Sequence, residues 1–183
     1  MENLEGSSPI DKITTRSVGI RFGLIMGAVG VIYFLIASTI GLDMNQGIWK
    51  WASLSYVIVI LFYAHKYFKD NGNGYMSFGE GVGISFWVGL ISAPISSIVS
   101  YIYWKLIDSS MIQLAIDQAR QKMENEGKMS EEQIDQAMSM ASKFMTPESF
   151  LIIGLIFGVI MIVIIGLLIT IFTQKRNPEP TYN

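Results

Sequence analysis

Few residues of this chain have the types and spacing that chemistry requires. It has no cysteine and a single histidine, His65, which excludes thiol catalysis, disulfide bonds and metal sites built from cysteine or from several histidines of one chain. His65 falls in the last turn of an apolar segment, where the helix dipole favours an interfacial histidine. We therefore interpret His65 as an interfacial residue and predict no catalytic, cofactor-binding or metal-binding residue.

One loop has part of the spacing of a calcium-binding loop. In Lys69–Gly81 (KDNGNGYMSFGEG), oxygen-bearing side chains stand at the third, fifth, ninth and twelfth positions of an EF-hand pattern, with glycine at the sixth. The first position is Lys69, a cation where the pattern requires a coordinating aspartate. Asn-Gly pairs are typical of tight turns, and Ser77 with Glu80 fits a capping box. We interpret the segment as a turn followed by a helix start.

Serines recur at helical spacing further along the chain. Ser92, Ser96 and Ser100 lie four residues apart, so a helix places them on one face, with Ser97 beside them. No nucleophile–base constellation can be named around them or elsewhere, which predicts that the protein is not an enzyme. In a channel, these serines would be candidate pore-lining residues.

The elements that carry these residues are predicted to be membrane helices. Charged residues make up 15 % of the chain, against about 25 % in typical soluble domains, and the apolar residues gather in four long blocks. No ionisable residue sits in the middle third of a block, which counts against proton-coupled or ion-coupled transport. The net charge of −2 gives no reason to expect a nucleic-acid partner, so the expected surroundings are the lipid bilayer.

The pattern predicts an all-α, polytopic membrane protein with an amphipathic helical hairpin between its third and fourth transmembrane helices. Ser130 with Gln133 forms a second capping box inside the hairpin, and Thr146-Pro147 is typical of a helix start. The predicted segments are a flexible cytoplasmic tail at 1–17, transmembrane helices at 18–42, 48–68 and 77–107, the hairpin at 108–146, the fourth transmembrane helix at 148–173 and a cytoplasmic tail at 174–183.

Small residues repeat every fourth position on three of these helices, and such faces let helix backbones approach closely in a membrane. Within the third helix, Pro94 removes one backbone hydrogen bond and predicts a kink. The predicted helix-packing residues are Gly19, Gly23, Gly27, Gly81, Ser85, Gly89, Ala93, Ser97, Gly154 and Gly158.

Basic residues are distributed unevenly between the two ends of the predicted spans. They precede the first span, follow the second and follow the fourth, whereas the short link between the first two spans has only Lys50 nearby. The positive-inside bias therefore predicts that both termini are cytoplasmic and that the hairpin lies on the other side of a cell membrane.

Three stretches are similar to a known family. The segments Tyr75–Phe86 (YMSFGEGVGISF) and Gly127–Pro147 (GKMSEEQIDQAMSMASKFMTP), together with the Ile/Gly-rich final span, resemble a family of small bacterial membrane proteins known as domain-of-unknown-function family 4199. The resemblance covers about residues 14 to 176. It implies four spans with a helical insertion before the last one and a location in the bacterial cell membrane, and it implies no catalytic or binding residues.

Two functional hypotheses follow from these patterns. The first is a non-enzymatic accessory component that assembles with a membrane protein partner, or with copies of itself, through its small-residue faces. The alternative is a small channel or transporter with a pore along the serine face of the third transmembrane helix.

Overall fold

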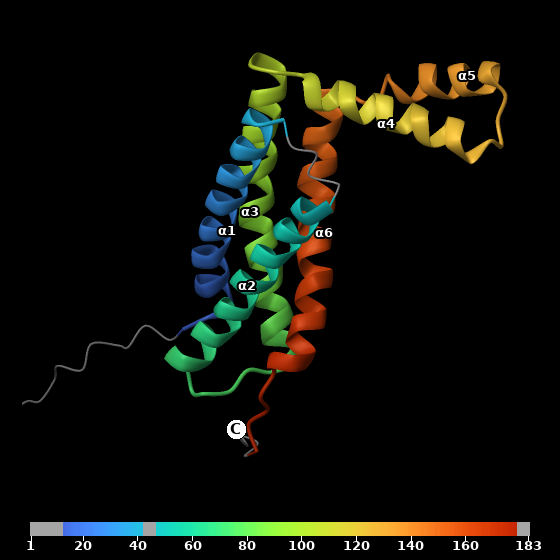
Figure 1. Cartoon of the computed structure of the whole chain (residues 1–183). Coiled ribbons are helices and arrows are strands. Elements are labelled where there is room, and N and C mark those ends of the chain that lie inside the picture. Colours follow the sequence, from blue (N-terminus) through green and yellow to red (C-terminus); the bar gives the residue numbers. More distant parts are fainter. Residues whose placement is uncertain (1–12, 42–46, 179–183) are drawn as a thin grey trace, which may run out of the picture.

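The computed structural model describes residues 13–41 and 47–178, and this part of the chain is built from six α-helices (Figure 1). Four of them, α1 (Thr15–Thr39), α2 (Gly47–Asn71), α3 (Phe78–Leu106) and α6 (Pro147–Thr173), are long and apolar enough to cross a membrane. The shorter helices α4 (Ser110–Glu126) and α5 (Glu131–Ala141) lie between α3 and α6 in the sequence. The all-α membrane fold predicted from the sequence is therefore confirmed, whereas residues 1–12 and 179–183 of the predicted tails lie outside the described residues.

Local side-chain hydrogen bonds explain where several helices begin. The Ser77 hydroxyl accepts the Glu80 N–H at 3.3 Å, and the Glu80 carboxylate accepts the Ser77 N–H at 2.7 Å, as the capping-box pattern predicts. The same reciprocal arrangement joins Ser130 and Gln133 at the start of α5. The predicted turn and helix start after α2 are therefore confirmed.

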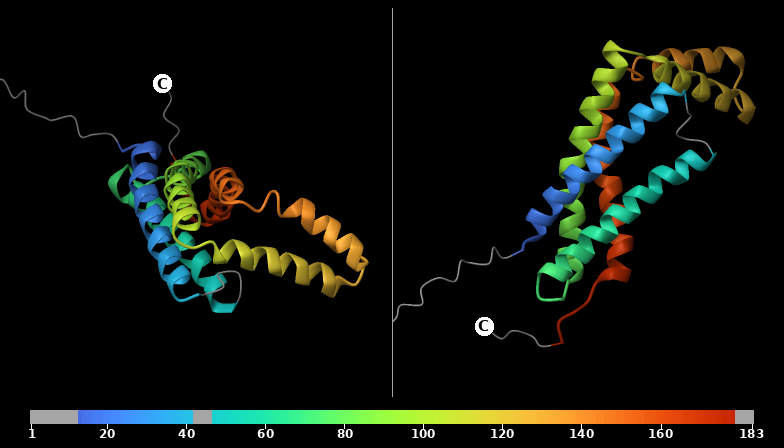
Figure 2. Two further views of the ribbon diagram at one scale, coloured as in Figure 1. Left: turned by 90° about the horizontal axis from the view of Figure 1, so that it is seen from above. Right: turned by 60° about the vertical axis from the view of Figure 1, so that its left-hand side comes forward.

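Helix α3 is the central element, with α1 and α6 as its main neighbours (Figure 2). The glycines of α1 make the first of these contacts. A Cβ atom at Gly23 would lie 2.8 Å from the Ile91 Cβ and 3.0 Å from the Val88 carbonyl oxygen, so no side chain fits there. Gly19 and Gly27 likewise face Trp87 and Ile95 of α3.

The small residues of α3 face α6. A Cβ at Gly89 would lie 3.3 Å from the Val159 Cα, and one at Gly158 would lie 3.0 Å from the Ala93 Cβ. The residues predicted for helix packing thus lie in two contacts within one chain, namely Gly19, Gly23 and Gly27 between α1 and α3, and Gly81, Ser85, Gly89, Ala93, Ser97, Gly154 and Gly158 between α3 and α6. Helix α3 continues through Pro94, and the predicted kink stays a prediction.

The bundle has two distinct ends, which we call the turn end and the hairpin end. The turn end contains the α2–α3 connection and the end of α6, and a short antiparallel bridge between Met76 and Lys175 joins these two segments. The main buried core lies near this end and includes Leu61, Ile84 and Val88, each fully buried. The hairpin end contains the ends of α1 and α3 and the starts of α2 and α6 (Figure 1).

Helices α4 and α5 run side by side and project sideways from the hairpin end (Figures 1 and 2). Ile112 of α4 and Ile134 and Met138 of α5 are buried. Arg120 of α4 contacts the Asp135 carboxylate of α5 at 2.8 Å. The apolar stripes of these helices therefore contribute to contacts within the hairpin, which extends away from the membrane bundle.

Candidate functional site

A cleft of about 350 Å³ lies between α2 and the α3–α6 pair in the hairpin-end half of the bundle. It exists because α2 packs tightly only in its second half, where Leu61, Ala64 and Phe68 are buried. The first half of α2 diverges from α3 and α6, as the right-hand view of Figure 2 shows. The volume is at the lower end of the range that holds small molecules.

Polar groups of α3 line this cleft. The Ser92 hydroxyl donates to the Val88 carbonyl of its own helix at 2.8 Å. Ser96, Ser97 and Ser100 also line the cleft and contribute hydroxyls to it. The indole Nε1 of Trp104 is buried at the cleft, and it lacks a partner among the residues described. Hydrogen-bonding groups without partners are costly in a membrane, so water or a ligand is expected to satisfy them.

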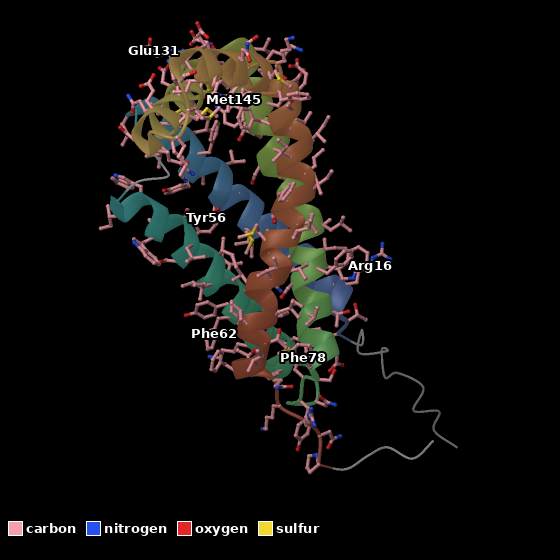
Figure 3. The ribbon with its side chains drawn as sticks, turned by 90° about the vertical axis from the view of Figure 1, so that its right-hand side faces the viewer. Arg16, Tyr56, Phe62, Phe78, Glu131 and Met145 are labelled. Carbon is pink, nitrogen blue, oxygen red and sulfur yellow. The ribbon has the colours of Figure 1, made fainter. Side chains whose placement is uncertain are left out.

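The rest of the lining is apolar or aromatic, and none of the lining residues carries a charge. Met26 of α1, Val57 of α2 and Ile162 of α6 contribute apolar surface. Tyr56 lies at mid-length of α2, where Figure 3 labels it, and contributes a phenol to the lining. An apolar wall with a few hydroxyls and one N–H donor suits an uncharged molecule that has hydrogen-bonding groups.

A second polar cluster surrounds His65 at the turn end. The His65 Nδ1 lies 2.8 Å from the Thr173 hydroxyl of α6, and its Nε2 lies 3.1 Å from the Gly81 carbonyl oxygen of α3. Lys69 donates to the Thr173 carbonyl at 2.8 Å. His65 itself is fully buried, with 0 % of its surface exposed. The prediction of an interfacial histidine is therefore wrong, because α2 continues to Asn71 and its last part lies against both α3 and α6.

Ser85 also lies near His65, but the pair does not have the geometry of a catalytic dyad. The Ser85 hydroxyl is 3.4 Å from the His65 Nε2, while it lies 3.0 Å from the Gly81 carbonyl oxygen and donates there. Both side chains are fully buried, and the other ring nitrogen meets a hydroxyl where a triad has a carboxylate. The serine hydroxyl thus bonds to the backbone of its own helix, and its contact with His65 contributes to packing.

The candidate calcium loop is occupied by its own turn contacts. The Asn73 side chain accepts the Tyr75 N–H at 3.0 Å, and the Asn71 amide donates to the Tyr67 carbonyl at 2.9 Å. Across the described ranges, no group of three His, Asp or Glu side chains gathers at metal-binding distance.

Sequence reasoning missed the burial of His65, although a signal for it exists. Leu61, Ala64, His65 and Phe68 follow the spacing of one helix face, so His65 shares the side of α2 that packs on its neighbours. For Trp104, the sequence shows an interfacial aromatic residue, and nothing in it indicates an indole N–H without a partner at the cleft.

Comparison with known proteins identifies the family of the chain. A family model described as a protein of unknown function, DUF4199, matches residues 21–175, which is most of the 183 residues. No curated protein and no solved structure matches the chain. The match agrees with the resemblance found in the sequence, and the chain belongs to the DUF4199 family of proteins of unknown function.

Proposed function

We propose that this protein is a non-enzymatic channel or carrier of the bacterial cell membrane, through which a small uncharged solute passes along the serine face of α3. The observation that carries the proposal is the cleft, which three serine hydroxyls of α3 line and where the buried Trp104 indole N–H has no partner in the described part of the chain. In a membrane, a path for a polar solute needs such groups, because they replace hydrogen bonds that the solute loses with water.

The cleft is open over one half of the bundle and closed over the other. Toward the turn end, Leu61, Ile84 and Val88 fill the space between the helices, and His65 bonds to α3 and α6 behind them. A path that is closed at one end is what a carrier or a gated channel has in one of its states. The positive-inside bias puts both termini and the turn end in the cytoplasm, so the cleft would open toward the outside.

The packing of the helices weakens the alternative of assembly through small-residue faces. Those faces are filled within the chain, where Gly23 contacts α3 and Gly158 contacts Ala93. A bulky residue at Gly81 or Gly89 would disturb the contact of α3 with α6 whatever the role of the protein. Such substitutions therefore do not separate an assembly role from a transport role.

The proposal is tested by solute uptake into liposomes that contain the purified protein. Glycerol and urea serve as uncharged probes, and light scattering after rapid mixing follows their entry. Wild-type protein should speed entry over protein-free liposomes, and Ser100→Leu should abolish most of the increase because leucine fills the cleft.

The matched control is Ile98→Leu on the same helix, since Ile98 is 48 % exposed on the outer surface of the bundle and does not line the cleft. This variant should transport as the wild type does. Equal entry with Ser100→Leu and wild type, or no increase with either probe, would contradict a solute path along the cleft.

A second candidate, assembly with a membrane protein partner, is favoured by one observation on the hairpin. Met140, near the end of α5, is 67 % exposed, and Phe144, just beyond the helix, is 71 % exposed. Both belong to the helix pair that extends away from the bundle (Figure 1). Methionine-rich apolar surfaces are adaptable binding surfaces. Purification in mild detergent should then yield a partner in a fixed ratio, and Phe144→Ser should release that partner.

A further inference from the structure

The buried network around His65 has a defined proton arrangement. A carbonyl oxygen accepts only, so the Nε2 that lies 3.1 Å from the Gly81 oxygen carries the hydrogen in the neutral ring. The Nδ1 is then an acceptor, and the Thr173 hydroxyl at 2.8 Å is its donor. Neutral His65 therefore joins α2 to α3 through one nitrogen and to α6 through the other.

The same network can take up one more proton without losing the histidine's hydrogen bonds. The Thr173 hydroxyl oxygen also lies 2.9 Å from the Ile169 carbonyl oxygen. If Nδ1 becomes protonated, it donates to the Thr173 oxygen, and the hydroxyl hydrogen turns to Ile169. Rotation of this one hydroxyl is thus the only rearrangement that proton uptake requires locally.

The charge of the proton, in contrast, is not compensated in this network. His65 is fully buried, and its hydrogen-bond partners are two hydroxyls and a carbonyl. On α2, the Lys69 ammonium bonds to the Thr173 carbonyl and adds positive charge beside the ring. A buried cation without a counter-charge destabilises the packing around it.

The charged groups on the other elements near the turn end have different partners. On α3, the Glu80 carboxylate caps its own helix through Ser77. After α6, the Lys175 ammonium lies over the Tyr75 ring, and on α1 the Arg21 guanidinium donates to the Tyr67 hydroxyl. Within the described ranges, none of these groups hydrogen-bonds to His65, whose partners are Thr173, Gly81 and Ser85.

We propose that His65 is a proton-binding site that controls the closed end of the cleft, so that the neutral ring holds α2 against α3 and α6 and proton uptake releases it. Its role in gating rests on the transport function proposed above, whereas the proton site and the release of α2 rest on the network alone. Because the charged ring has no counter-charge in the closed arrangement, closure is favoured at high pH, where the ring is neutral, and is lost on acidification, when the ring takes up a proton.

The first test uses the fact that His65 is the only histidine of the chain. Protein labelled with nitrogen-15 in histidine and held in lipid bilayers gives one pair of ring signals by nuclear magnetic resonance. At pH 8, the Nε2 signal should be of the protonated type and the Nδ1 signal of the unprotonated type, and both should be protonated at pH 5. A ring that stays neutral at pH 5, or the opposite tautomer at pH 8, would overturn the proposal.

The second test measures the movement of α2. Spin labels on Tyr63→Cys of α2 and Phe172→Cys of α6 report their separation, because both positions are exposed and the chain has no cysteine of its own. The separation should increase between pH 8 and pH 5, with the closed-to-open ratio changing at most about tenfold per pH unit for one proton. His65→Gln, which has a polar amide but no titration, should keep one separation at both values.

Equal shifts in both proteins, or no shift in the protein that retains His65, would refute the proposed release. Neither measurement depends on solute uptake. A pH response of His65 in a protein that transports nothing would therefore contradict the transport function alone, and transport without this response would contradict the proton site alone.

Discussion

Alanine in place of Gly23 is expected to destabilise the protein through the contact between α1 and α3. The added Cβ would lie 2.8 Å from the Ile91 Cβ and 3.0 Å from the Val88 carbonyl oxygen. Carbon atoms pack best at roughly 3.5–4.0 Å, so α1 must move away by about 1 Å or the backbone must distort. Overpacking of this kind costs about 1–3 kcal/mol. The higher helix propensity of alanine offsets about 1 kcal/mol of it.

A matched variant separates the contact from the helix propensity. At Gly83 in α3, an added Cβ meets only ordinary contacts, the nearest being 3.8 Å away on Thr15. Gly83→Ala should therefore stabilise the protein by up to about 1 kcal/mol, whereas Gly23→Ala should destabilise it by up to about 2 kcal/mol. Reversible unfolding in mixed micelles of dodecyl maltoside and sodium dodecyl sulfate measures both. A Gly23→Ala protein at least as stable as Gly83→Ala would refute the close approach of α1 to α3.

Three further predictions concern topology and the hairpin. A cysteine at Gly127 should react with an impermeant thiol reagent in intact cells, whereas one at Gly79 should react only after lysis; the reverse result would invert the proposed orientation. Ile134→Ala removes a buried side chain and should destabilise the hairpin by about 2–4 kcal/mol, whereas Met140→Ala, at an exposed position, should leave its stability nearly unchanged. Hydrogen exchange of the α5 amides measures both effects. Equal effects of the two substitutions would contradict the packing of α5 on α4. The Ser110 hydroxyl and N–H donate hydrogen bonds to the Asp108 carboxylate and lower its pKa. These bonds therefore stabilise the start of α4 at pH values above about 3.9, the ordinary pKa of aspartate. The stabilisation is lost as the pH falls through the lower pKa that Asp108 has in the folded protein. Exchange of the Ser110 amide should then increase with acid relative to an Asp108→Asn protein, and parallel behaviour of the two would contradict it.

The sequence predicts the parts of this fold that depend on local pattern. Hydropathy indicates the four long helices, and the reciprocal bonds of Ser77 with Glu80 and of Ser130 with Gln133 begin helices where the motif predicts. These features need only residues close in the chain. The spacing of small residues likewise indicates which helix faces allow close approach. It does not indicate whether the helix that packs there belongs to the same chain or to another one.

The site depends on long-range geometry, which the spacing does not contain. His65 lies near the end of an apolar segment in the sequence, and its burial requires both Gly81 of α3 and Thr173 of α6. The cleft arises from the oblique course of α2, which packs through Leu61 and Ala64 but lies apart from α3 and α6 over its first half, so that Tyr56 lines the cleft (Figure 2). The serine row was visible from the sequence, whereas the space in front of it was not.

The central place of α3 has a consequence for how the protein is made. Its first neighbour, α1, is synthesised before it, but the helix that fills its other face, α6, follows only after α4 and α5. At about 5–20 residues per second, Gly89 and Ala93 wait several seconds for Val159 and Gly158 to leave the ribosome. During that interval, we expect the nascent chain to depend on lipid or on the insertion machinery to cover the second face of α3.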